Sequence, residues 1–261
     1  MASTDINTSQ HFALTAAMNV AFGNPQGELR DFLAIPGAAR HQPQSYNEES
    51  WGRLTNQCRN IQSEITEFKK AIQDNDGDEV RDSLCDIRIF AYGGAHFLGY
   101  NIGKTHLYTI GLTMQEAHIM EFLFTLDPEP ALDAAFSYLM HAIGTREWNM
   151  VESALRLMIY TTDHVSARLG LTAEHINDDM VEVLDAVMTR FVKDADDFEA
   201  TASHHAAYGV SKFYTVGEYP TMAFKSAEDQ EDAPQGKFLK SASYRKPVFK
   251  VIPGFPIGAA V

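Results

Sequence analysis

An apolar stripe between residues 54 and 72 constrains the fold of this chain more than any other feature of its sequence. Its members recur three or four positions apart, the spacing that places side chains on one face of an α-helix. They are Leu54, Cys58, Ile61, Ile65, Phe68 and Ile72. A second stripe follows the polar turn at 74–78, at Val80, Leu84, Ile87, Ala91 and Leu98. Two such stripes joined by a short turn predict a helical hairpin that buries its apolar faces in a bundle core.

Helical periodicity extends over most of the remaining chain. We expect short helices at 12–22 and 28–35, and further helices at 114–124, 130–145, 148–169 and 173–195. Beyond residue 200, short aromatic and β-branched runs alternate with Gly and Pro, which predicts an irregular or short-stranded extension. The expected fold class is all-α, a helical bundle with a C-terminal extension. Its expected segments are a helical and loop segment at 1–46, a core at 47–200 and the extension at 201–261.

The core contains a weak internal repeat. When the sequence is shifted by 71 residues, Ala71 falls on Ala142 and Val80 falls on Val151. Either the second half of the core, about 130–200, is a degenerate copy of the helices at 47–100, or the matches arise by chance in a helical chain.

Composition excludes several functional classes. The formal net charge of −14 over 261 residues argues against a general nucleic-acid-binding protein, which needs a basic surface. No apolar run reaches the length of a membrane span, and the polar N-terminus lacks the apolar core of a signal peptide. Cys58 and Cys85 form no disulfide framework, so we expect buried thiols in a reducing compartment. The protein is expected in the cytoplasm, with no nucleic-acid or membrane partner.

Five acidic residues form two rows on the predicted hairpin. The first helix carries Glu64 and Glu67, and the second carries Glu79, Asp82 and Asp86. Residues at these spacings share a helical face, so their like charges repel and reduce stability. Hard cations between the rows would relieve this repulsion, and Mg²⁺ binds through carboxylates together with substrate phosphates. The rows therefore point to phosphate chemistry.

Both rows continue into apolar positions. The first row begins at Asn60 and ends at Ala71, and the second runs into Phe90, Gly93 and Phe97. A solvated face usually stays polar along the whole helix, so this pattern favours a row that faces protein or a pocket. Charges on an exposed helix face remain the alternative.

Two other cation or phosphate motifs fail at specific positions. The segment 74–85 begins like a calcium loop, but it has Glu79 where an EF-hand needs Gly and Cys85 where it needs Glu. The segment 99–105 has three residues between its glycines, whereas a P-loop has four and follows a strand. We therefore expect 74–78 to form a turn.

The acidic motifs and their surroundings resemble the all-α nucleoside triphosphate pyrophosphohydrolase superfamily. Within it, they are most similar to MazG-like and phosphoribosyl-ATP pyrophosphohydrolase-like proteins, which are often phage-encoded. The resemblance rests on ExxE at 64–67 and ExxD at 79–82, followed by Asp86, and it is closest over 58–101. Two positions depart from the family pattern. Ser63 replaces a frequent second Glu, and Gly209 replaces an Asn in the closing segment.

The resemblance implies hydrolysis of a (deoxy)nucleoside triphosphate to the monophosphate and pyrophosphate, with Mg²⁺ as cofactor and Mn²⁺ as a substitute. The implied metal ligands are Glu64, Glu67, Glu79, Asp82 and Asp86. Glu64 or Glu67 would be the general base. The resemblance also implies a homo-oligomer, a dimer or a tetramer, and is consistent with a duplicated helix pair.

Basic residues are concentrated near the C-terminus. Between Gly236 and Lys250 there are five Lys or Arg and no acidic residue. Candidates for substrate binding are Asn60, Lys212, Lys237, Lys240 and Arg245. The basic segment is either a lid that grips phosphate or a strip packed on the acidic body.

The leading hypothesis is a pyrophosphohydrolase that controls the nucleotide pool in the cytoplasm of a phage-infected bacterium, with dUTP or dGTP as candidate substrates. The alternatives are an alarmone hydrolase, a non-catalytic nucleotide-binding or interaction protein on the same fold, and a structural helical protein with solvated acidic faces.

Overall fold

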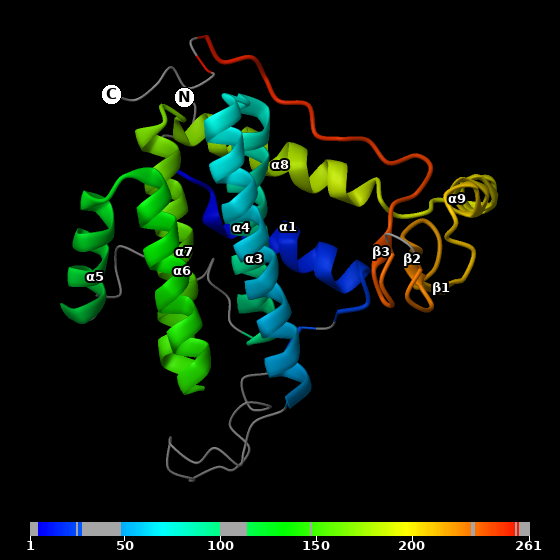
Figure 1. The fold of residues 1–261 in the computed structure, drawn as a ribbon, viewed down its shortest axis with the longest axis horizontal. Helices are drawn as coiled ribbons and strands as arrows, with labels where there is room; N and C mark the ends of the chain where they lie inside the picture. Colours follow the sequence, from blue (N-terminus) through cyan, green and yellow to red (C-terminus); the bar gives the residue numbers. More distant parts are fainter. Residues whose placement is uncertain are drawn as a thin grey trace. The chain divides into compact units, whose positions relative to one another are not determined.

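The protein is mostly helical, which confirms the all-α class at this level. The computed structural model describes residues 5–24, 26–27, 48–99, 114–146, 148–230, 233–253 and 255. Eight helices and one three-stranded sheet lie within these residues (Figure 1). In the same part of the chain, no helix is both long enough and apolar enough to cross a membrane. The helix expected at 28–35 lies outside the described residues.

The chain divides into two compact units. The first comprises Met1–Ala16, Gln26–Met180 and Phe249–Val261, and the second comprises Ala17–Pro25 and Val181–Val248. The boundaries between the two units do not coincide with the segment ends expected at residues 46 and 200.

Four helices form a bundle in the first unit. They are α3 (Glu48–Asp74), α4 (Gly77–Phe97), α6 (Pro128–Thr145) and α7 (Trp148–Arg168). Helix α3 packs against α4 and α6, and α7 packs against the same two helices, which closes a ring (Figure 1). Helix α5 (Met114–Thr125) packs on α6 and α7. The predicted stripe residues Leu54, Ile61 and Phe68 are fully buried in this core.

The turn between α3 and α4 has clear local causes. Asn75 adopts a left-handed conformation (φ 54°), which Asn tolerates better than most residues. Asp76 then caps α4, because its carboxylate accepts a hydrogen bond from the backbone N–H of Glu79 at 3.1 Å. Asp78 and Glu79 in the first turn also suit the positive end of the helix dipole. The predicted turn at 74–78 is therefore present.

The two helical hairpins match each other at the offset of the sequence repeat. Helix α4 begins and ends 71 residues before α7, and α3 ends 71 residues before α6. The left-handed turn residue Asn75 corresponds in the same way to Arg146, which also has φ 54°. After the second helix of each hairpin, a glycine with positive φ follows, Gly99 in one and Gly170 in the other. The weak sequence repeat thus coincides with a repeated hairpin geometry.

A buried ion pair links α4 to α7. Arg88 donates from Nε to Asp163 Oδ1 at 2.8 Å and from Nη2 to Ser166 Oγ at 2.7 Å. Helix α1 (Thr8–Ala21) begins beside this polar core, with the Phe12 ring edge-on to Tyr92 at 6.2 Å between centroids. Both cysteines are free and buried, as expected from the sequence.

The second unit is built around aromatic packing. It contains the C-terminal part of α8 (Ala173–Met188), helix α9 (Ala195–Ala207) and strands β1 (Phe213–Val216), β2 (Ala223–Ser226) and β3 (Phe238–Leu239). The strands are antiparallel in the order β1-β2-β3, with Tyr214 opposite Lys225. The predicted short-stranded character of the extension is therefore confirmed.

The prediction of a helix at 173–195 was wrong about where the helix ends. Helix α8 ends at Met188, and Val192 instead pairs with Met222 through two backbone hydrogen bonds. A new helix, α9, begins after Asp194, whose carboxylate accepts from the backbone N–H of Asp197 at 2.9 Å. The Asp194 cap was the sequence signal for this missed helix.

Candidate functional site

The two acidic rows lie on adjacent helices of one hairpin. Glu64 and Glu67 belong to α3, and Glu79, Asp82 and Asp86 belong to α4, which packs against α3. The short turn makes the two helices antiparallel neighbours (Figure 1), and Glu64 lies near the middle of α3. The structure therefore places all five carboxylates that the sequence singled out on one helical hairpin.

Glu64 is the electrostatic centre of this acidic cluster. Burial raises its pKa, and repulsion from Asp86, Glu67, Asp82 and Glu79 adds to this, so that the pKa reaches about 9. Its side chain is half-buried, as are those on α4, while Glu67 is exposed. A fully solvated acidic face would not produce this combination of burial and repulsion. The row faces protein on one side, as its apolar continuation predicted.

The donor set of the cluster fits a hard divalent cation. Carboxylate oxygens are the ligands that Mg²⁺ and Mn²⁺ prefer, and a cation there would stabilise the ionised form of Glu64. Within the described residues, however, no three His, Cys, Asp or Glu side chains are arranged to hold a metal ion. The cluster therefore has the charge and the ligand chemistry of a metal site, without the arrangement of one among the described residues.

The candidate substrate-binding residues are distributed between the units. Asn60 is exposed on α3, one turn before Glu64. The four cations belong to the second unit, where Lys212 pairs with Glu228 at 2.7 Å and the Lys240 ammonium lies 4.2 Å from the centre of the Tyr244 ring. The backbone carbonyl of Lys237 accepts from the N–H of Ser226 at 2.9 Å.

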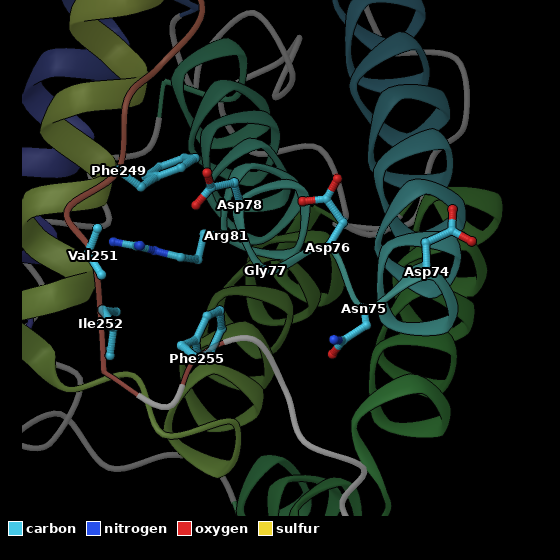
Figure 2. A pocket seen from close by; sticks show the side chains of 10 residues that line it. All are labelled: Asp74, Asn75, Asp76, Gly77, Asp78, Arg81, Phe249, Val251, Ile252 and Phe255. Atoms are coloured by element: carbon cyan, nitrogen blue, oxygen red, sulfur yellow. The ribbon is translucent and has the colours of Figure 1, made fainter.

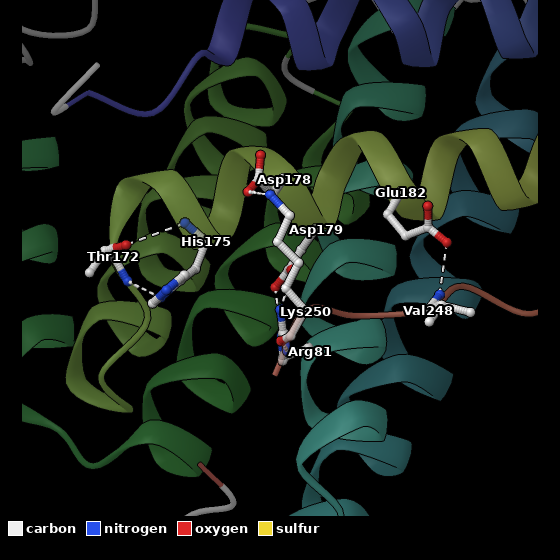
Figure 3. Close-up of polar contacts among 8 residues, drawn as sticks. All are labelled: Arg81, Thr172, His175, Asp178, Asp179, Glu182, Val248 and Lys250. Carbon is white, nitrogen blue, oxygen red and sulfur yellow. Dashed lines mark hydrogen bonds and ion pairs between the residues drawn. The ribbon is translucent and has the colours of Figure 1, made fainter. Parts of the chain in front are cut away.

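The contacts of Arg245 and Lys250 favour a packed basic strip over a lid that grips phosphate. Arg245 forms an ion pair with Glu182 of α8. The backbone N–H of Val248 donates to the same carboxylate at 2.8 Å (Figure 3). In the first unit, Lys250 pairs with Asp178 of α8 at 2.6 Å (Figure 3). These contacts are those of a basic strip packed on an acidic helix.

A cavity of about 470 Å³ lies beside the turn between α3 and α4. The acidic turn 74–78 lines one side, and the C-terminal residues Phe249 and Phe255 line another (Figure 2). The acidic turn was visible in the sequence. The aromatic side was not, because it comes from residues about 170 positions further along the chain.

Sequence reasoning also missed Arg81, which lies inside the ExxD motif. Its side chain is 3% exposed and forms a bidentate pair with Asp179 of α8, with N···O distances of 2.8 and 2.5 Å. No local pattern distinguishes this arginine from an exposed one.

Comparisons of this chain with protein-family models, with curated proteins and with solved structures found no match.

Proposed function

We propose that this protein hydrolyses a (deoxy)nucleoside triphosphate to the monophosphate and pyrophosphate, with Mg²⁺ as its cofactor and Mn²⁺ as a substitute. The observation that carries the proposal is that half-buried Glu64 lies among four other carboxylates, so that burial and their repulsion raise its pKa to about 9. Carboxylates with strongly shifted pKa values are concentrated at functional sites, so the environment of Glu64 supports a functional role. A site of this charge attracts cations and binds an anionic substrate only through them.

The roles of the carboxylates follow from their environments. A bound Mg²⁺ would supply charge neutralisation of the triphosphate and activation of water. Either Glu64 or Glu67 would accept a proton from the attacking water, and a bound cation would keep Glu64 ionised for that role. Glu67 is exposed, and its Oε1 accepts a hydrogen bond from Ser63 Oγ at 3.2 Å. Glu79, Asp82 and Asp86 supply oxygen ligands from α4.

The cellular setting that we propose follows the family resemblance. The enzyme controls the nucleotide pool, with dUTP or dGTP as candidate substrates, in the cytoplasm of a phage-infected bacterium, and works as a homo-oligomer. Hydrolysis of an alarmone is the alternative reaction for the same site.

A panel of nucleoside triphosphates with Mg²⁺, scored for pyrophosphate release, tests the proposal. Glu67→Gln and Asp86→Asn should each reduce turnover by at least about 10²-fold, since each removes a charged ligand or base. Circular dichroism should show unchanged helix content in both variants.

Asp133→Asn is the matched control. Asp133 lies on α6 and pairs with Lys69 in an exposed ion pair at 2.7 Å, an interaction of small energetic value. Its loss should leave turnover unchanged. Absence of pyrophosphate with every nucleotide would end the catalytic proposal.

A non-catalytic nucleotide-binding protein is the second candidate. It predicts nucleotide binding in the same panel without release of pyrophosphate.

A further inference from the structure

Arg81 connects three parts of the first unit. It lies on α4 between Glu79 and Asp82, and it pairs with Asp179 on α8. Its Nη1 also donates to the backbone carbonyl of Lys250 at 2.7 Å. The guanidinium carbon lies 4.7 Å from the centre of the Phe249 ring, a cation–π contact. One buried side chain thus holds α4, α8 and the C-terminal segment together.

The C-terminal segment 249–253, here called the strap, runs alongside α8 at Asp178 and reaches α4 at Arg81 (Figure 3). Its side chains are not enclosed, since Val251 is 93% exposed. Next to Arg81, the cavity of about 470 Å³ separates the strap from much of the turn at 74–78 (Figure 2). The strap is therefore attached by a few defined contacts, and those of Arg81 join it to α4.

Arg81 and the acidic residues of α4 point to different sides of that helix. Successive residues of an α-helix are about 100° apart around its axis, so Arg81 points to a different side of α4 from Glu79 and Asp82. An anchor on that side fixes the rotation of the first turns of α4. It therefore also fixes the direction in which Glu79 and Asp82 point.

We propose that Arg81 is a positioning residue for the acidic cluster, and that it transmits docking of the strap to the turn of α4 that carries Glu79 and Asp82. This rests on the proposed function, because it concerns the metal affinity of the same cluster. Metal affinity depends on ligand placement within about 0.5 Å. A small rotation of α4 is thus enough to change how well its two carboxylates reach a shared cation.

Arg81→Lys in the full-length protein tests the inference. Lysine keeps the charge, but it cannot reproduce the bidentate pair with Asp179 and the bond to the strap carbonyl together. Titration with MgCl₂ alone, followed by calorimetry, should show a dissociation constant raised by about tenfold or more. Hydrogen exchange should increase in the first turns of α4. At saturating Mg²⁺, kcat should return to within about twofold of the wild-type value, a split that general destabilisation does not give.

Two further variants keep the test decisive. Phe249→Leu keeps apolar volume but removes the ring beside Arg81, and it replaces Arg81→Lys if that variant does not fold. Lys250→Gln is the control, because it removes the exposed ion pair with Asp178 and leaves the carbonyl that Arg81 contacts. It should leave Mg²⁺ affinity unchanged.

Raised hydrogen exchange with unchanged Mg²⁺ affinity in Arg81→Lys would overturn the inference and leave the proposed function intact. A wild-type protein that binds Mg²⁺ but hydrolyses no triphosphate would end the proposed function instead, and the Mg²⁺ titration would still decide the role of Arg81.

Discussion

At the scale of single residues, Glu64 has the most perturbed environment in the acidic cluster. Burial and four neighbouring carboxylates raise its pKa from an ordinary 4.5 to about 9. At neutral pH without a cation, Glu64 therefore keeps its proton in the folded state. In the unfolded state it would lose that proton. Folding and metal binding are consequently both linked to the protonation of this one side chain.

This linkage gives a pH dependence with a definite sign. Between pH 4.5 and about 9 the folded state binds the proton of Glu64 and the unfolded state does not, so the free energy of unfolding falls as pH rises. In EDTA, Glu64→Gln should remove this contribution. Urea denaturation of the variant and the wild type across that pH range should then give free energies of unfolding whose pH dependences diverge. Glu121→Gln, at an 81% exposed position on α5, is the control and should keep the wild-type slope. Parallel curves for Glu64→Gln and wild type would contradict the assigned environment.

His11 contributes with the opposite sign over a narrower range. Burial, with repulsion from Arg88, lowers its pKa from 6.5 to about 4, so stability from this residue is lost as pH falls through that interval. The comparison of Glu64→Gln with wild type cancels this contribution, because both proteins contain His11.

At the scale of elements, the two hairpins depend on close helix contacts at specific positions. A Cβ atom at Gly94 of α4 would lie 3.1 Å from Leu155 of α7 and 3.1 Å from Leu54 of α3. A Cβ atom at Gly144 of α6 would meet nothing within 4 Å. Gly94 therefore marks a place where α4 closely approaches both of its neighbours.

Valine at these two glycines should have unequal effects. Gly94→Val inserts a branched side chain between two buried leucines and should lower the free energy of unfolding by roughly 1–3 kcal/mol. Gly144→Val adds the same atoms in open space and should change it by no more than about 0.5 kcal/mol. Urea denaturation followed by circular dichroism measures both. Equal changes in the two variants would show that close packing at Gly94 does not decide the result.

At the scale of the whole molecule, local patterns predicted the helices and the acidic cluster but not the long-range contacts. The spacing of Leu54 and Phe68 fixed a buried face, and the apolar end of the acidic row at Phe97 indicated that the row meets protein. The end of α8 was missed because Val192 continues the helical period, although its backbone pairs with Met222, 30 positions later. The partners of Arg81 were missed for the same reason. Its bond to Lys250 spans 169 positions, and no periodicity encodes such a pairing.

The net charge of −14 makes one control essential for any test of cation binding. Any salt screens the self-repulsion of such a chain, so stabilisation by Mg²⁺ alone does not establish a site. A nucleoside triphosphate analogue with a methylene group between the α and β phosphorus atoms, added with MgCl₂, should raise the melting temperature by about 5 °C at 100 times its dissociation constant. NaCl at the same ionic strength should not reproduce this shift.

Asp86→Asn and EDTA distinguish binding at a site from general screening of charge. Asp86→Asn should abolish the shift produced by the analogue with MgCl₂, and EDTA should abolish it in the wild-type protein. Exposed helix faces without a site predict equal shifts in wild type and Asp86→Asn, because one charge in a surplus of 14 changes general screening only slightly. The difference between the melting-temperature shifts of wild type and Asp86→Asn therefore measures specific binding by the five carboxylates, separately from general screening of their charge.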